Sequence, residues 1–182
     1  MAVDCLLTSG FNGVACANSN PGAKTFVYFA NESEIVSYTS GTPDGVYTAI
    51  TFDAGKGLSR YEVAKNTLIG RESLQGGEQD LSSYNHEVEF NIKSMGPEAR
   101  NAIQDLNGPN MVAIVPTKNG EFIVLGKDVG MKILTNDATT DTDGYGETVV
   151  LQATEMPEKR SFIFITDSDT TLAYLESKVV AS

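Results

Sequence analysis

The sequence predicts a mainly β fold: an antiparallel β-sandwich or barrel with one short α-helix, at about residues 97–107, and extended loops or arms. Three local patterns predict it. Residues 84–92 alternate between apolar and polar side chains, residues 97–107 carry an apolar stripe at helical spacing, and two apolar runs flank Asn119-Gly120. Short strands separated by turn residues are typical of sandwiches and barrels.

The segment YNHEVEFNI, residues 84–92, is expected to be a strand with one buried and one solvated face, because successive side chains of a strand point to opposite sides. The apolar face would hold Tyr84, His86, Val88, Phe90 and Ile92. The polar face would hold Asn85, Glu87, Glu89 and Asn91.

The helix is expected next. Pro97 suits the first helical position, and Gly108-Pro109 is a stop signal. The apolar stripe between them consists of Ala99, Ala102, Ile103 and Leu106.

Asn119-Gly120 is expected to form a two-residue type I′ hairpin turn, because both residues tolerate positive φ. Other runs of strand-forming residues bring the expected total to about eight to ten strands: 25–31, 34–39, 47–53, 57–69, 129–134, 145–154 and 161–166. Residues 70–83 and 135–144 are expected to be loops. Residues 167–177 favour a last short helix, with Asp167, Ser168 or Asp169 as its N-cap.

The chain is expected to have three parts. Residues 1–23, rich in Gly, Asn, Ser and Ala, form an N-terminal arm; residues 24–165 form the β-barrel or sandwich domain; and residues 166–182 form the short C-terminal helix and a tail.

Composition narrows the possible partners. The 182 residues carry a formal net charge of −11, and the densest basic spot is Lys159-Arg160 beside Glu158. Tight DNA binding is therefore not expected, because it needs clustered Lys and Arg. No apolar run approaches the ~20 residues that span a membrane, so no membrane insertion is predicted, and the first ten residues make a poor signal peptide.

Cys5 and Cys16 are expected to be two small, partly buried thiols, although a disulfide between them stays open. Two thiols are too few for a zinc site.

Candidate chemistry is sparse. His86 lies on an apolar strand face without a neighbouring nucleophile or acid, so a packing role is predicted. Residues 54–59 resemble part of a phosphate loop but lack its flanking glycine and hydroxyl residue, so a β-turn is predicted.

The acidic residues Asp137, Asp141, Asp143 and Glu147 suggest calcium. The segment lacks the first and last ligands of an EF-hand loop, which favours a solvated hairpin tip. No convergent set of catalytic groups is found, so neither an enzyme, nor a cofactor, nor a metal site is predicted.

One stretch carries a family resemblance. The sequence HEVEFNIKSMGPEARNAIQDLNGPNMVAIVPTKNGEFIVLGKDVGMKIL, followed by YGETVVLQATE, resembles the second half of tail tube (major tail) proteins of long-tailed bacteriophages. The resemblance covers roughly residues 84–155 and brings no catalytic motif.

The resemblance implies hexameric rings that stack into a hollow tube, with strands of six subunits closing an inner barrel through which DNA passes without sticking. It also implies other tail proteins as partners, such as the sheath, terminator or baseplate, and a place in the virion after assembly in the host cytoplasm. We expect Asn85, Glu87, Glu89 and Asn91 to line the bore; a solvent-facing outer wall is the alternative for them. Residues 1–23, 70–83 and 166–182 are expected to contact neighbouring rings, because they are too polar and Gly-rich to build a core.

Two other functions stay open. The first is a single-ring tail protein: a tail terminator, head–tail connector or distal tail ring. The second is a receptor- or carbohydrate-binding β-sandwich module, which the absence of Trp disfavours, because such modules stack aromatic rings on sugars.

Overall fold

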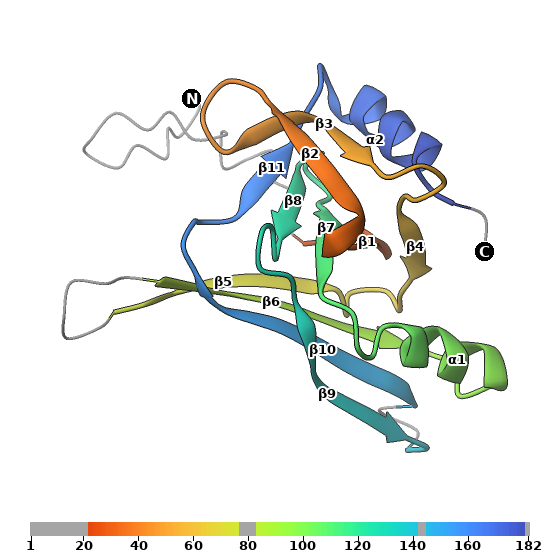
Figure 1. Ribbon diagram of the computed structural model, residues 1–182. Helices are drawn as coiled ribbons and strands as arrows, with labels where there is room; N and C mark the ends of the chain where they lie inside the picture. The colour runs from red at the N-terminus through yellow and green to blue at the C-terminus, as the bar shows by residue number, and fades with distance from the viewer. Residues whose placement is uncertain (1–21, 77–82, 142–144, 181–182) are drawn as a thin grey trace, which may run out of the picture.

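The computed structural model describes residues 22–76, 83–141 and 145–180. These residues form eleven strands and two α-helices, so the predicted mainly β fold is confirmed (Figure 1). One sheet has seven strands in the order β2-β3-β11-β8-β7-β1-β4, and the other has four in the order β5-β6-β10-β9.

The strands of the seven-stranded sheet are β1 (Phe26–Asn31), β2 (Ile35–Ser40), β3 (Val46–Phe52), β4 (Ser59–Glu62), β7 (Met111–Pro116), β8 (Phe122–Leu125) and β11 (Ser161–Ile163). Those of the four-stranded sheet are β5 (Ile69–Gln75), β6 (Ser83–Ile92), β9 (Lys132–Thr139) and β10 (Gly146–Met156). The helices are α1 (Pro97–Asp105) and α2 (Ser168–Ser177), and a 3-10 turn, η2 (Glu32–Glu34), joins β1 to β2.

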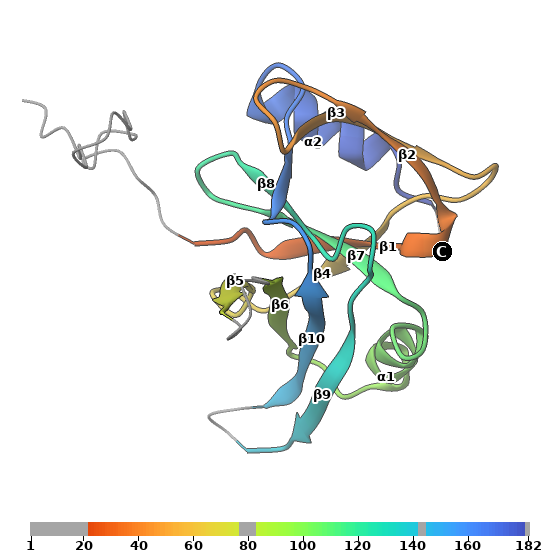
Figure 2. The same cartoon turned by 60° about the vertical axis from the view of Figure 1, so that its left-hand side comes forward.

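The two sheets pack face to face around the larger apolar core (Figure 2). Val88 and Phe90 from β6 and Leu151 from β10 are fully buried there, and the seven-stranded sheet contributes Phe29 and Val115. The alternation of residues 84–92 is therefore confirmed, because their apolar side chains face this core.

A second core lies on the other face of the seven-stranded sheet, under α2. Leu175 of α2 is buried there with Tyr28 and Ile114. Strands β1 and β7 are buried on both faces because they lie between the two cores.

The helix α2 was predicted, and its N-cap is Asp167, whose Oδ1 accepts a hydrogen bond from Thr170 N at 2.7 Å. The expectation that residues 166–182 build no core is wrong. Thr171 and Leu175 are fully buried, and Tyr28 donates a hydrogen bond to Glu176 at 2.5 Å, so the helix is part of the folded body.

The helix α1 begins at Pro97 as predicted and ends at Asp105, two residues early. Its buried side chains are Ala99 and Ile103, and Ile103 belongs to the larger core together with Leu106. The Tyr61 hydroxyl donates a hydrogen bond to the Ala102 carbonyl at 3.1 Å, which ties α1 to β4.

The β7–β8 hairpin forms where Asn119-Gly120 predicted it, but the two-residue type I′ turn is wrong. Gly120 alone has positive φ, at 87°, and its N–H donates to the Thr117 carbonyl at 3.2 Å. The loop is thus three residues long, with the left-handed glycine that closes such turns. A Cβ on Gly120 would also lie 2.8 Å from Ser168 Oγ, so α2 packs against this turn.

Two expected loops contain strands. Residues 69–75 form β5 and residues 132–139 form β9, where loops over 70–83 and 135–144 were expected. Both strands lie at edges of the four-stranded sheet, where almost every side chain is exposed. Neither face of these strands carries an apolar stripe, so the sequence pattern does not predict them. They are recognised as strands by their backbone pairing with β6 and β10.

Three smaller expectations also change. The run 57–69 yields β4 and only the first residue of β5, because Asn66 turns the chain between them with φ of 63°. The run 161–166 yields a three-residue strand, and Phe164 beyond it is 42% exposed instead of covered on both sides. The pairing of β11 with β3 is parallel, whereas every other strand pair is antiparallel.

Most of the predicted N-terminal arm, with Cys5 and Cys16, lies outside the described residues, as do residues 77–82 and Asp143. Neither α-helix in the described ranges has the length and apolar character needed to cross a bilayer.

Candidate assembly surface

The four-stranded sheet has one face turned away from the seven-stranded sheet, which we call the outer face. Asn85, Glu87, Glu89 and Asn91 lie together on it, because their neighbours in β6 point into the core. All four are half-buried within the flat sheet. Figures 1 and 2 show no described helix or strand over this face.

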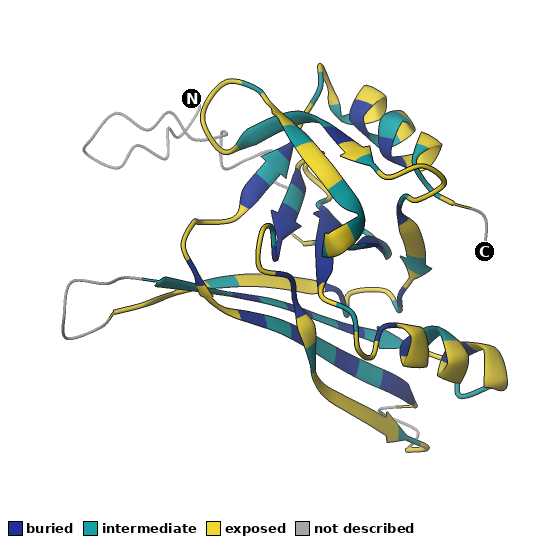
Figure 3. Ribbon diagram, in the orientation of Figure 1, coloured by how far each residue is buried: buried dark blue, intermediate teal, exposed yellow. Residues whose placement is uncertain are grey.

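Strand register arranges the outer face in rows. One row crosses Ile69, Glu89, Val150 and Thr135; the next crosses Arg71, Glu87, Gln152 and Lys132; a third crosses Asn91, Thr148 and Asp137. Figure 3 shows that exposure increases from the central strands towards β5 and β9. The polar residues predicted from β6 are thus the centre of a wider polar surface.

Arg71 on β5 pairs with both acids at the centre and offsets one of their two negative charges. Its Nη1 donates to Glu87 and lies 3.0 Å from Glu89 Oε2. The hydrogen bond to Glu87 raises the pKa of the guanidinium, so Arg71 keeps its charge. The rows together hold three carboxylates and two cations, which leaves a net charge of only minus one. The outer face is therefore polar and nearly neutral, although the whole chain is strongly acidic.

Asn91 also links β6 to neighbouring segments through hydrogen bonds. Its side-chain amide donates to Thr148 Oγ1 at 3.0 Å, and its backbone N–H donates to Thr67 Oγ1 at 3.2 Å. These bonds fix the turn before β5 to the end of β6. Asn91 therefore has a structural role, whether or not the outer face binds anything.

Both edges of the four-stranded sheet are open within the described residues. Strands β5 and β9 each pair on one side only, and they are seven and eight residues long. Natural edge strands are commonly protected by proline, by shortness or by a covering element. Neither strand contains proline. A bulge near Leu134 shifts the register of β9, and no other described strand pairs with the outer edge of β5 or of β9.

His86 is buried, with 1% of its surface exposed, which agrees with the predicted packing role. Its Nδ1 accepts a hydrogen bond from Gly126 N at 3.2 Å, so the ring proton lies on Nε2. Among the described atoms Nε2 has no hydrogen-bond partner, and Glu72 Oε2 lies 3.8 Å away. Burial lowers the pKa of the imidazole, although the charge of Glu72 opposes this shift.

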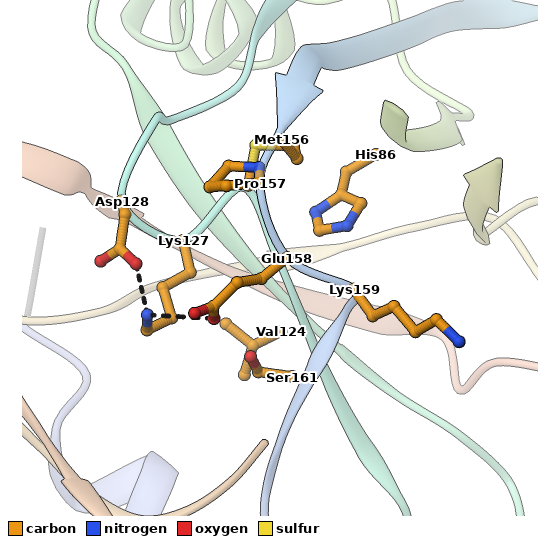
Figure 4. A pocket seen from close by; sticks show the side chains of 9 residues that line it. All are labelled: His86, Val124, Lys127, Asp128, Met156, Pro157, Glu158, Lys159 and Ser161. Atoms are coloured by element: carbon orange, nitrogen blue, oxygen red, sulfur yellow. Dashed lines mark hydrogen bonds and ion pairs between the residues drawn. The ribbon is translucent and has the colours of Figure 1, made fainter. Parts of the chain in front are cut away.

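The cavity beside His86 is small (Figure 4). Its volume is about 10 Å³, which is about the space of one water molecule. Lys127 lies across it and pairs with Asp128 and, at 3.8 Å, with Glu158. A cavity of this size cannot hold an organic substrate.

The other sequence candidates are not brought together. Asp137 lies in β9, and Glu147 is buried in β10, where it accepts a hydrogen bond from Asn136 at 3.4 Å. Over residues 22–76, 83–141 and 145–180, no three acidic, histidine or cysteine side chains gather as metal ligands would. Asp53 to Lys56 form the predicted β-turn, closed by a 3.0 Å backbone hydrogen bond.

No family model matches this chain, and no curated protein or solved structure matches it either.

Proposed function

We propose that this protein is a self-assembling structural subunit, the tail tube protein of a long-tailed bacteriophage, which forms hexameric rings stacked into a tube. The four-stranded sheet is the observation that carries the proposal. It combines two long edges and a polar face that no other described strand or helix pairs with or covers. A sheet with these properties leaves its hydrogen bonds to be completed by a second copy of the same sheet.

The strand order fixes how two copies would pair. Adjacent strands of the order β5-β6-β10-β9 are all antiparallel, so β5 and β9 run in opposite directions. Rotation about a ring axis that runs along the strands preserves each strand's direction. The β9 edge of one copy would therefore meet the β5 edge of the next in an antiparallel pair, and this head-to-tail contact closes into a ring.

Six copies would place about 24 strands around the axis, more than the 16–18 strands that already leave an aqueous channel. The outer face would then line the bore, with Asn85, Glu87, Glu89 and Asn91 at its centre. A nearly neutral lining without a cationic cluster gives DNA no counterion-releasing contact to hold it. Residues 1–23 would join one ring to the next, and sheath, terminator or baseplate proteins would join the tube ends and wall in the virion.

Electron microscopy of the concentrated, purified protein tests this proposal. Long tubes with a continuous central channel are the expected result. Single rings that do not grow would instead support a tail terminator, connector or distal tail ring. A protein that stays monomeric at every concentration and salt level would contradict both assembly functions.

A further inference from the structure

A groove of about 440 Å³ lies beside β5, over the side of β8 and β11 that faces the four-stranded sheet. Strand β5 crosses β8 and β11, and its end of the arrow of β8 is visible in Figure 1. A Cβ on Gly70 would lie 3.3 Å from Leu125 Cδ1 in β8. Glu72, the next β5 residue on the same face, lies 3.3 Å from Arg160, which is level with Leu125 in the β8–β11 pair.

The groove occupies the position of the next strand of the four-stranded sheet. His86 of β6 accepts a hydrogen bond from Gly126 N at 3.2 Å, so β6 lies on the Gly126 side of Leu125. Ile123 and its register partner Phe162 therefore lie on the other side, beyond the free edge of β5. Two residues of β8 separate Ile123 from the level that β5 crosses. This is about 7 Å, comparable with the ~4.8 Å spacing of one added strand.

A strand added at this edge would gain more than backbone hydrogen bonds. Ile123 and Phe162 are only half-buried, and together they form an apolar floor for the groove. Packed sheets lie about 10 Å apart, so the side chains of an added strand would reach this floor. The strand would bury apolar area against the seven-stranded sheet while it pairs with β5.

Charged groups at the groove limit what that strand can carry. Arg160 is paired with Glu72, and its guanidinium lies 5.8 Å from the centre of the Phe162 ring, so an anionic side chain would compete with Glu72 for it. Glu121 is exposed at the outer end of the groove, two residues beyond Ile123. It would repel a second carboxylate. An apolar side chain on a strand without net negative charge therefore fits the groove.

Strand β9, the other edge of the same sheet, meets these requirements. Leu134, at its bulge, is 56% exposed. The strand carries one cation, Lys132, and one anion, Asp137, so it brings no net charge. Its eight residues are long enough to cross both β8 and β11. A second β5 edge would fit less well, because it would bring another Glu72 carboxylate to the groove.

We propose that this groove receives β9 of a second copy of the chain, with Leu134 packed against Ile123 and Phe162. The inference rests on the proposed function for its partner. It adds that the contact between copies has two layers: β5 supplies the backbone pairing, and the seven-stranded sheet supplies an apolar support beneath the incoming strand.

A double-mutant cycle tests the contact. Neither Phe162 nor Leu134 is fully buried, so Phe162→Gln and Leu134→Gln should both retain the circular dichroism spectrum and urea midpoint of the unmodified protein. Each should raise the concentration needed for assembly, measured by sedimentation, by about tenfold. If the two side chains touch, the double variant should also lose about tenfold, whereas independent effects would multiply to about a hundredfold. Ile123→Thr provides a second floor variant with the same expectation.

Val36→Gln is the matched control. It removes another apolar side chain, 60% exposed, from β2 at the far edge of the seven-stranded sheet. This variant should assemble like the unmodified protein. Assembly of Phe162→Gln at the unmodified concentration, or a hundredfold loss in the double variant, would overturn the two-layered contact and leave the proposed function standing. An unmodified protein that never assembles would overturn both.

Discussion

At the scale of single residues, His86 couples burial to proton binding. Burial lowers the pKa of its imidazole, so the unfolded chain, in which histidine titrates near its ordinary value of about 6.5, binds the proton more tightly. The free energy of unfolding should therefore fall as pH drops below about 6.5. The His86→Gln variant keeps an acceptor for Gly126 N but does not titrate. We expect its stability to fall less than that of the unmodified protein between pH 7 and pH 5.5, as measured by urea denaturation. If the free energies of unfolding of the two proteins changed equally with pH, this role of His86 would be contradicted.

Arg71 belongs to the same scale, because one guanidinium pairs with both Glu87 and Glu89. Its side chain is half-exposed, so Arg71→Gln should change the free energy of unfolding by no more than about 0.5–1 kcal/mol. In a ring, however, each copy would present two unpaired carboxylates to the bore. We expect assembly of this variant, measured by sedimentation, to fall about tenfold at low salt and to recover near 0.5 M salt, where screening shortens the range of repulsion.

Lys56→Gln is the matched control for Arg71→Gln. It removes the same charge from an ion pair with Glu34 at 2.8 Å, in the turn between β3 and β4. This variant should assemble like the unmodified protein. An equal loss of assembly in both variants would mean that net charge matters and that the outer face does not.

At the scale of elements, the β5 edge can be tested with a pair of prolines. Proline has no N–H, and the N–H groups of successive strand residues point to opposite edges. Ser73→Pro and Leu74→Pro therefore act on opposite edges of β5. One of them removes a backbone hydrogen bond to β6, and the other removes only an N–H donor at the free edge. We expect the first variant to lose about 1–3 kcal/mol of stability. The second should retain its circular dichroism spectrum but form no rings by electron microscopy. If both variants assemble, this edge is not the contact.

The N-terminus of α2 gives a second prediction at this scale. The hydrogen bond from Thr170 N lowers the pKa of the Asp167 carboxyl, so folding favours its ionised form. This stabilisation is present above the ordinary carboxyl pKa of about 3.9 and is lost as pH falls through the lower pKa of the folded state. Asp167→Ala should therefore lower Tm at pH 7, with a difference that shrinks below about pH 4. Asp167→Asn keeps an acceptor and should remain close to the unmodified protein at pH 7.

At the scale of the whole molecule, the two sheets share one core and should unfold together. Phe90 of β6 is fully buried, and its ring lies 5.7 Å from that of Phe29 in the opposite sheet. Phe90→Ala should lower the free energy of unfolding by about 3–5 kcal/mol. Circular dichroism and tyrosine fluorescence should report the same urea midpoint. Phe164→Ala, at a 42% exposed position, should cost less than about 1 kcal/mol. Two separate transitions would contradict a shared core.

Sequence reasoning found the elements with a strong local signal. Residues 84–92 alternate because one face of β6 is core, and α1 begins at a proline that suits a first turn. It missed β5 and most of β9, whose side chains are nearly all exposed and lack periodicity. It did not show that Arg71 pairs with Glu87 and Glu89 on the outer face, because Arg71 lies in a segment expected to be a loop.

The sequence by itself determined the mainly β class, the polar stripe of β6, the position of both helices and the hairpin at Asn119-Gly120, because these depend on neighbours within a few positions of the chain. Only the tertiary structure decided which strands are edges, that α2 covers a second core, and that Arg71 meets Glu87 and Glu89. Those features depend on contacts between residues far apart in sequence, and hydrogen bonding between strands leaves no local pattern in the side chains of an exposed edge.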